Sequence, residues 1–171
     1  MNYFELFGLP EGFQLDGSAL ASRYRELQRA VHPDNFASGS DRDRMMAMQK
    51  TAEVNDAFQT LKSPLSRAEY LLRLNGIELR GETATINDPL FLMQQMELRE
   101  ALEALASSND PEQEAIALEQ EFRSLDRTLM AQLESQLLQQ QWEEAAVTVR
   151  KLKFVQKLEQ ELALLEEQWE L

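Results

Sequence analysis

The stretch that decides the fold is Ala30-Val31-His32-Pro33-Asp34-Asn35-Phe36. Pro33 ends the helix before it, because proline has no backbone N–H and its ring pushes the preceding residue away from helical dihedral angles. The apolar residues that recur with helical spacing before this stop are Leu20, Tyr24, Leu27 and Val31. They predict a helix over residues 18–31, and a second helical pattern covers residues 41–62 after a run of turn formers. The sequence therefore predicts two antiparallel helices whose connecting loop carries the chain's only histidine.

The loop can be interpreted in two ways from its residues alone. A histidine near a helix C-terminus, then a proline and an aspartate, is typical of a simple helix terminator. Alternatively, His32 and Asp34 would form the acid–base pair of a hydrolase. No cysteine, second histidine or Gly-x-Ser-x-Gly motif supplies a nucleophile, and no Gly-x-x-x-x-Gly-Lys-Ser/Thr loop would hold ATP. We therefore expect no catalytic residue.

Composition limits the possible functions further. The absence of cysteine from all 171 residues excludes disulfides, thiolate zinc sites and iron–sulfur ligation by the chain's own thiolates. Residues 76–171 carry eight basic and twenty acidic side chains, against nine and ten in residues 1–75. A chain this acidic repels phosphate backbones, so we expect no nucleic-acid partner. Without a recognisable signal peptide or apolar span, we expect a bacterial cytoplasmic protein with no membrane contact, metal or cofactor.

The rest of the chain shows further helical patterns. Pro64 follows Ser63, an expected N-cap, and this helix should end at Asn75-Gly76, a pair suited to a left-handed C-cap. Asp-Pro pairs open helices over about residues 89–106 and 111–138, and a third helix begins near residue 141. We therefore predict an all-α protein: a helical hairpin domain at residues 1–75, a linker at 76–88 and a three-helix bundle at 89–171.

The helix that Pro89 opens has two apolar faces. The stripe that would seat it in the bundle consists of Phe91, Gln95, Leu98, Leu102 and Leu105. The residues that cluster on nearly the opposite side are Leu92, Met93, Met96, Glu97 and Glu100. Methionines bordered by carboxylates are typical of a protein-binding surface, although periodicity alone also allows both faces to be buried. Phe154, off the apolar stripe of the last helix, would extend this surface.

The His32-Pro33-Asp34 motif, in a hairpin loop after the aromatic-rich start Tyr3-Phe4-Glu5-Leu6-Phe7, resembles the J-domain family. J-domain proteins bind ATPase chaperones of the DnaK class and accelerate their ATP hydrolysis. The resemblance implies that these three loop residues contact the chaperone, and that Asp34 meets a chaperone arginine in a charge-assisted pair. It adds a small basic face consisting of Arg23, Arg25 and Arg29. Without the resemblance, these arginines are ordinary solvated helix surface.

Further stretches resemble the HscB family, the J-type co-chaperones of iron–sulfur cluster assembly. They are Phe36-Ala37-Ser38-Gly39-Ser40, Arg67-Ala68-Glu69-Tyr70-Leu71-Leu72 and the acidic helical second half. The resemblance implies an HscA-like chaperone and an IscU-like iron–sulfur scaffold protein as partners. The scaffold-contact positions that it implies are Leu92, Met93, Met96, Glu97, Glu100 and Phe154.

Two positions depart from the family pattern. J-domains usually follow the motif with lysine where this chain has Asn35, and some relatives have an acidic residue where it has Ala104. The first departure removes electrostatic help at the tip, and the second shortens the acidic edge of the scaffold surface. The alternative functions are a J-domain co-chaperone for other clients and a non-catalytic helical adaptor.

Overall fold

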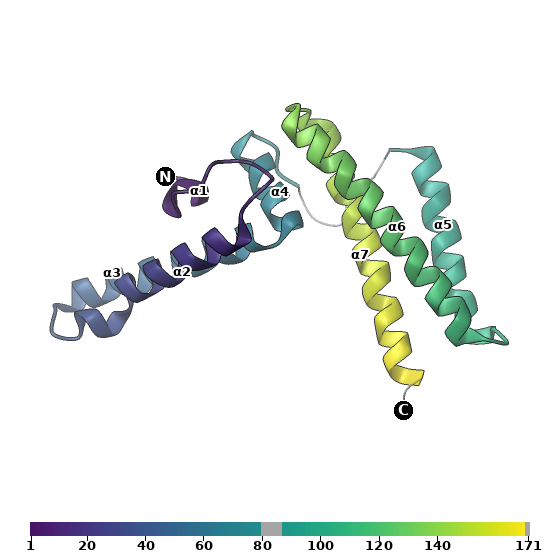
Figure 1. Ribbon diagram of the computed structural model, residues 1–171, viewed down its shortest axis with the longest axis horizontal. Helices are drawn as coiled ribbons and strands as arrows, with labels where there is room; N and C mark the ends of the chain where they lie inside the picture. Colours follow the sequence, from purple (N-terminus) through teal and green to yellow (C-terminus); the bar gives the residue numbers. More distant parts are fainter. Residues whose placement is uncertain (80–86, 170–171) are drawn as a thin grey trace. The chain divides into compact units, whose positions relative to one another are not determined.

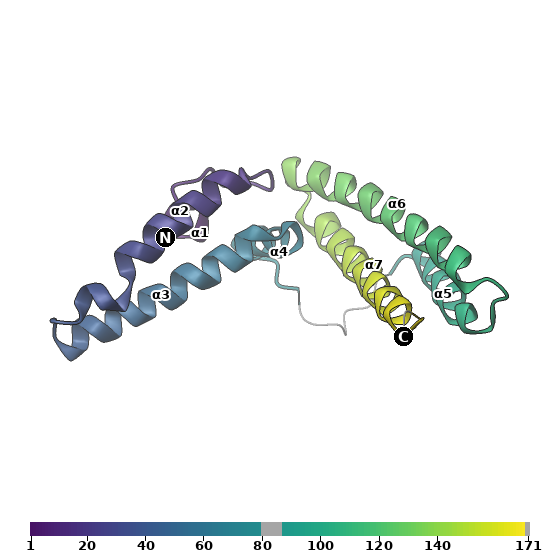
Figure 2. The same cartoon turned by 60° about the horizontal axis from the view of Figure 1, so that its bottom comes forward.

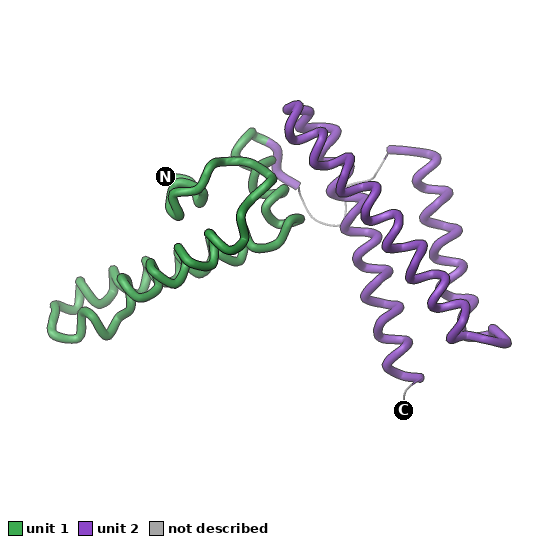
Figure 3. Tube along the Cα trace, in the orientation of Figure 1, with its two compact units in different colours: residues 1–76 green, residues 77–171 purple. Residues whose placement is uncertain are grey.

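The computed structural model describes residues 1–79 and 87–169. These residues form seven α-helices and two short 3₁₀ helices, with no strand among them, so the predicted all-α class is confirmed. The chain divides into two compact units, residues 1–76 and 77–171 (Figure 3). The predicted linker overlaps the start of the second unit, and its residues 80–86 lie outside the described residues.

The first unit is a hairpin of two long helices with two shorter helices at its base. Its helices are α1 (Tyr3–Leu6), α2 (Gly17–Val31), α3 (Asp41–Lys62) and α4 (Pro64–Leu74). Helices α2 and α3 run antiparallel and side by side, and the 3₁₀ helix η1 (Pro33–Phe36) lies in the loop between them (Figure 1). The carboxylate of Asp16 caps α2 by accepting the backbone N–H groups of Ser18 and Ala19. Gly76 has φ +85°, the left-handed conformation predicted after α4.

Ser63 does not cap α4 in the predicted way. It occupies the N-cap position, but its side chain accepts no hydrogen bond from the helix. The Ser66 hydroxyl instead donates to the Thr60 carbonyl at 2.7 Å, and the Arg67 guanidinium donates to the Leu61 carbonyl at 2.8 Å. The start of α4 is therefore fixed by Pro64 at its first position and by side chains that reach back to the end of α3.

The core of the first unit lies at the base of the hairpin, away from its tip. The buried apolar residues there are Phe4, Phe7, Leu20, Val54, Ala57, Leu61, Leu65, Ala68, Tyr70, Leu71 and Leu72. Beyond Val54 toward the tip, α3 buries only Ala47, and α2 buries no residue after Leu20. The ring of Tyr24 stacks on that of Phe58, with centroids 4.0 Å apart. The tip end of the hairpin thus has few buried apolar contacts.

The second unit is the predicted three-helix bundle, with α5 (Pro89–Ala104), α6 (Pro111–Leu138) and α7 (Trp142–Trp169). Helices α6 and α7 pack antiparallel along their length, and α5 packs against both (Figure 2). Helix α5 ends two residues earlier than predicted, because its last turn tightens into the 3₁₀ helix η2 (Leu105–Ser107). The buried residues that line the bundle include Leu98, Leu102, Phe122, Leu133, Leu152, Val155 and Leu158.

Truncation should lower stability much more on the inner face of α5 than on its outer face. Leu98 is 3% exposed and Met96 is 64% exposed. Leu98→Ala should lower the free energy of unfolding by about 2–5 kcal/mol, because it leaves a cavity in the core. Met96→Ala should change it by no more than about 0.5 kcal/mol. Urea unfolding followed by circular dichroism measures both, and equal losses would show that the two faces are buried alike.

Two carboxylates at the interface of α6 and α7 are poorly solvated. Asp126 Oδ1 and Glu159 Oε1 are inaccessible to solvent and have no hydrogen-bond partner. Burial raises the pKa of Asp126, and burial together with the charge of Asp126 raises the pKa of Glu159. A carboxyl group whose pKa is raised in the folded state destabilises the fold where it is ionised. This destabilisation is fully present above the raised pKa and disappears as the pH falls through it toward the ordinary value.

Asp126→Asn should therefore stabilise the fold at neutral pH, because it removes the buried charge and retains the shape of the side chain. The gain should shrink at a pH near the ordinary carboxyl pKa, because the raised pKa lies above it and Asp126 of the parent is then protonated. Denaturant unfolding of parent and variant at both pH values measures the difference. Glu121→Gln, at an exposed position of the same helix, serves as the control. A gain of equal size at both pH values would contradict ionisation of Asp126 as its source.

Candidate functional site

The tip of the hairpin presents its charged side chains to solvent. His32 stands between α2 and η1, and its Nδ1 accepts the backbone N–H of Asp34 at 3.2 Å. The neutral imidazole therefore carries its proton on Nε2, which remains available as a donor. The Asp34 side chain is 91% exposed, with Oδ2 3.5 Å from His32 Nδ1. An exposed carboxylate can bind a cationic group on another protein.

Asn35 closes the end of α2. Its side-chain Nδ2 donates to the Arg29 carbonyl at 2.6 Å and lies 3.5 Å from the Ala30 carbonyl. These carbonyls belong to the last turn of α2, where the helix itself provides no donor. The residue that departs from the J-domain pattern thus satisfies backbone groups of the helix that precedes the tip.

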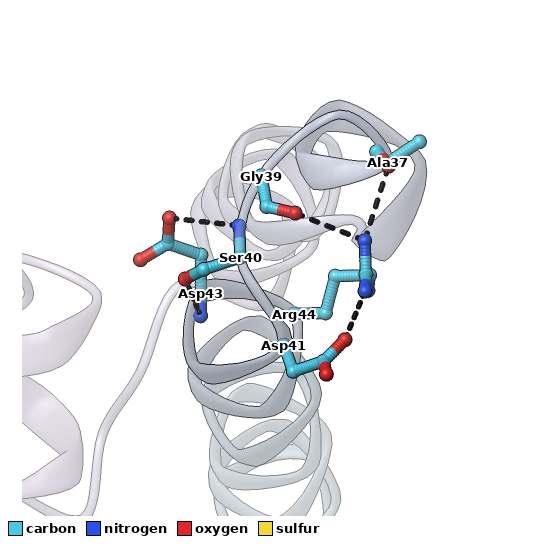
Figure 4. Close-up of polar contacts among 6 residues, drawn as sticks. All are labelled: Ala37, Gly39, Ser40, Asp41, Asp43 and Arg44. Carbon is cyan, nitrogen blue, oxygen red and sulfur yellow. Dashed lines mark hydrogen bonds and ion pairs between the residues drawn. The ribbon is translucent and has the colours of Figure 1, made fainter.

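The chain after the tip is held by two sets of side-chain contacts, which Figure 4 shows together. The Arg44 guanidinium donates to the carbonyls of Ala37 and Gly39, at 3.2 and 2.9 Å, and pairs with Asp41. Ser40 and Asp43 form a capping box at the start of α3, in which each side chain accepts the other residue's backbone N–H. These contacts return the chain from η1 into α3 with little help from apolar packing.

The three arginines of α2 do not form one cluster. Arg25 and Arg29 are exposed and share a face of the helix with the position of His32, at 100° per residue. Arg23 lies on a different face and nine residues before His32, roughly 14 Å along the helix axis. Its guanidinium lies beside Gly8, where an added Cβ would stand 3.1 Å from Nη1. Of the three, the structure thus brings Arg25 and Arg29 to the side of the tip.

The outward face of α5 is exposed as the sequence predicted. Leu92, Met93 and Met96 are 41%, 60% and 64% exposed, and Glu97 and Glu100 beside them are also exposed. We call these five residues the α5 surface. Apolar side chains bordered by carboxylates provide contact area for a partner surface that is apolar at its centre and positively charged at its rim.

Phe154 is half-buried, whereas its position off the apolar stripe indicated an exposed ring. Its ring packs edge-on against that of Phe91, with centroids 6.0 Å apart. Phe91 is a buried residue of the first turn of α5, so Phe154 supports that turn by packing against it. Only part of the Phe154 ring is exposed. Any contribution of Phe154 to binding is therefore mixed with a packing role.

An ion pair that the sequence did not reveal fixes the start of α5. Asp88 accepts the backbone N–H of Phe91 at 3.2 Å and Lys151 Nζ of α7 at 2.8 Å. The hydrogen bond from Lys151, and to a smaller extent the one from Phe91, lowers the pKa of Asp88. Lys151 Nζ also lies 5.2 Å from the centroid of the Phe91 ring. The Asp-Pro pair predicted the cap, but Lys151 is 63 residues away in the sequence, so only the tertiary structure identifies it.

A groove of about 420 Å³ borders the α5 surface on the side of α6. Its lining residues are Asp88, Leu90, Phe91, Met93, Gln94, Glu97, Leu125, Thr128, Leu129, Gln132 and Lys151. Met93 and Glu97 belong to both features, so the α5 surface is continuous with the groove. Of the α6 residues here, Leu125 and Leu129 belong to the apolar stripe that periodicity indicates for that helix, whereas Thr128 and Gln132 flank the stripe.

Within residues 1–79 and 87–169, no three histidine, cysteine or carboxylate residues are grouped closely enough to hold a metal ion. No helix in the same part of the chain is both long and apolar enough to cross a bilayer. The candidate site consists of two exposed surfaces, the tip and the α5 surface.

Comparisons with known proteins show the family of the chain. Residues 87–163 match the family described as the HSCB C-terminal oligomerisation domain. A co-chaperone protein HscB homolog of Vibrio campbellii is 56% identical over 167 residues, which cover 98% of each chain. The solved structure of chaperone HscB from Vibrio cholerae has a TM-score of 0.88 at 54% identity, covering 98% of this chain and 99% of that one. The human co-chaperone HscB structure has a TM-score of 0.88 at 32% identity, covering 97% of this chain and 82% of that one.

The all-helical fold, the His32-Pro33-Asp34 tip and these similarities define a co-chaperone. The chain belongs to the HscB co-chaperone family.

Proposed function

We propose that this chain stimulates the ATPase of an HscA-like chaperone of the DnaK class and delivers an IscU-like iron–sulfur scaffold protein to it. The tip would bind the chaperone, and the α5 surface with the exposed edge of Phe154 would bind the scaffold. The observation that carries the proposal is that this chain, a member of the HscB family, exposes both surfaces, one on each of its two units. The protein would act as a regulator in the bacterial cytoplasm, with no cofactor and no nucleic-acid or membrane partner.

The tip would act by shifting a conformational equilibrium of the chaperone. A co-chaperone changes its partner only by binding one state more tightly than the other. Asp34, exposed in the first turn of η1, would pair with a chaperone arginine in the hydrolysis-competent state. His32, Arg25 and Arg29 would supply flanking polar contacts, and Pro33 would fix the direction of the loop. Arg23 is included only as a peripheral contact, because it lies far from the tip along α2.

The α5 surface would bind the scaffold through apolar contacts framed by charge. Apolar anchors carry most of the energy of protein interfaces, and rim charges mainly guide association and specificity. Leu92, Met93 and Met96 would be the anchors, and Glu97 and Glu100 would attract a basic rim on the scaffold. The net charge of −12 over residues 76–171 favours such a partner.

Asp34→Asn should remove stimulation of the chaperone and leave the fold intact. The substitution keeps the shape of the side chain and the Asp34 N–H bond to His32, but it removes the charge. Loss of a charge-assisted hydrogen bond weakens binding by about 1.5–3 kcal/mol, or at least about tenfold. Single-turnover ATP hydrolysis by the chaperone and a circular-dichroism melt measure the two effects. Asp56→Asn, at an exposed position on α3, is the matched control. Full stimulation by folded Asp34→Asn protein would overturn the role of the tip.

A Leu92→Ala/Met93→Ala/Met96→Ala variant should lose scaffold binding and still stimulate the basal chaperone ATPase. Removal of several apolar anchors should weaken scaffold affinity by at least about 2 kcal/mol, roughly thirtyfold or more. Its melting temperature should stay near that of the parent, because all three side chains are exposed. Isothermal titration calorimetry with the scaffold protein measures the loss. Phe154 stays unchanged in this variant because its ring supports Phe91.

The matched control truncates three exposed apolar side chains elsewhere on the second unit. Ile116, Leu138 and Leu164 are 51%, 83% and 59% exposed and lie outside α5. Their combined change to alanine should leave scaffold affinity as in the parent. Normal scaffold binding by the α5 variant would exclude this surface as the client site and favour a J-domain co-chaperone for other clients.

A further inference from the structure

We propose that Asn35 is a positioning residue that holds the His32-Pro33-Asp34 tip in the conformation that the chaperone binds. This inference rests on the proposed function of the tip. It assigns a role to the position at which this chain departs from the usual J-domain lysine.

The His-Pro-Asp sequence leaves three carbonyls of α2 without their helical donors. In an α-helix each backbone N–H donates to the carbonyl four residues earlier. Arg29 would therefore receive the N–H of residue 33, but that residue is proline and has none. Ala30 would receive the N–H of Asp34, which instead donates to His32 Nδ1. Val31 would receive the N–H of Asn35, which instead donates to the His32 carbonyl at 3.0 Å.

Two side chains replace the missing donors. Asn35 Nδ2 lies 2.6 Å from the Arg29 carbonyl and 3.5 Å from the Ala30 carbonyl. The Thr51 hydroxyl of α3 lies 3.2 Å from the Val31 carbonyl, although it shares its single proton with the Ala47 carbonyl of its own helix. Asn35 thus replaces the donor that Pro33 lacks, and it does so from the residue that follows Asp34.

This hydrogen bond sets the path of the tip. It joins position 35 to the carbonyl of Arg29 and so fixes the segment between them, which contains the whole motif. Apolar packing gives little support, because Ala47 is the only residue of α2 or α3 buried beyond Val54 toward the tip. Without the Asn35 amide, the segment would also populate other conformations. The apparent affinity for the chaperone would then fall in proportion to the fraction of molecules whose tip keeps the binding conformation.

A second asparagine in the same unit separates positioning from general stabilisation. Asn75 Nδ2 donates to the Leu71 carbonyl at 2.8 Å, at the C-terminal end of α4. Asn75→Ala therefore removes the same kind of helix-capping bond from the same unit at a site away from the tip. Asn35→Lys supplies a conservative rescue, because a lysine near a helix C-terminus can donate to the last carbonyls.

The experiment measures chaperone ATPase stimulation against co-chaperone concentration for the parent, Asn35→Ala, Asn35→Lys and Asn75→Ala. Asn35→Ala should raise the half-maximal concentration about fivefold, the equivalent of one net hydrogen bond, and leave the rate at saturation unchanged. Asn35→Lys should stay at or below the parent's half-maximal concentration. Any gain from its added charge should fade with salt. Asn75→Ala should match the parent.

Amide hydrogen exchange of the free proteins gives a readout that does not depend on the chaperone. The backbone amides at positions 34 and 35 should exchange faster in Asn35→Ala than in the parent, and at the parental rate in Asn75→Ala. A parental half-maximal concentration in Asn35→Ala, or an equal loss in Asn75→Ala, would overturn the inference. If the parent itself fails to stimulate the chaperone, the proposed function is wrong, and unchanged exchange at the tip would additionally show that Asn35 does not hold it.

Discussion

The missing N–H of Pro33 is the constraint on which the first unit depends. It stops α2 at Val31, leaves the Arg29 carbonyl without its helical donor and turns the chain into η1. The amide of Asn35 and the hydroxyl of Thr51 satisfy carbonyls at this end of the helix. The turn that follows is narrow enough for α3 to return along α2. Pro33 thus ends α2 at the point where the chain turns and the charged residues of the tip begin.

The two units stabilise their exposed surfaces by different means. The tip lies beyond the apolar core of the first unit, and hydrogen bonds from Asn35 and Arg44 to backbone carbonyls hold it. The α5 surface stands on a packed bundle, and Leu98 and Leu102 anchor the opposite side of its helix. The Lys151–Asp88 pair sets the first turn of that helix. Polar backbone contacts thus order one surface, whereas apolar burial orders the other.

Local chemistry and periodicity were sufficient to predict most of the fold. Pro33 and the Asp-Pro pairs marked helix ends, and the helical period of α5 separated buried Leu98 from exposed Met96. Features that depend on residues distant in the sequence could not be predicted. Lys151 meets Asp88 across 63 residues, and Phe154 packs on Phe91 only because α5 crosses α7 at that point. The cap formed by Asn35 involves only neighbouring residues. Even so, the sequence pattern did not indicate that the Asn35 amide would donate to the Arg29 carbonyl, which Pro33 leaves without a donor.

The exposed methionines give the α5 surface a chemical vulnerability. Met93 and Met96 are exposed to solvent, and so to any oxidant dissolved in it. Conversion to methionine sulfoxide replaces a flexible apolar side chain with a polar one, and reductases can reverse it. Because neither residue lies in the core, oxidation would leave the bundle folded while its outer face became hydrophilic. The same exposure that suits these residues to an apolar partner would therefore make that contact sensitive to oxidative stress.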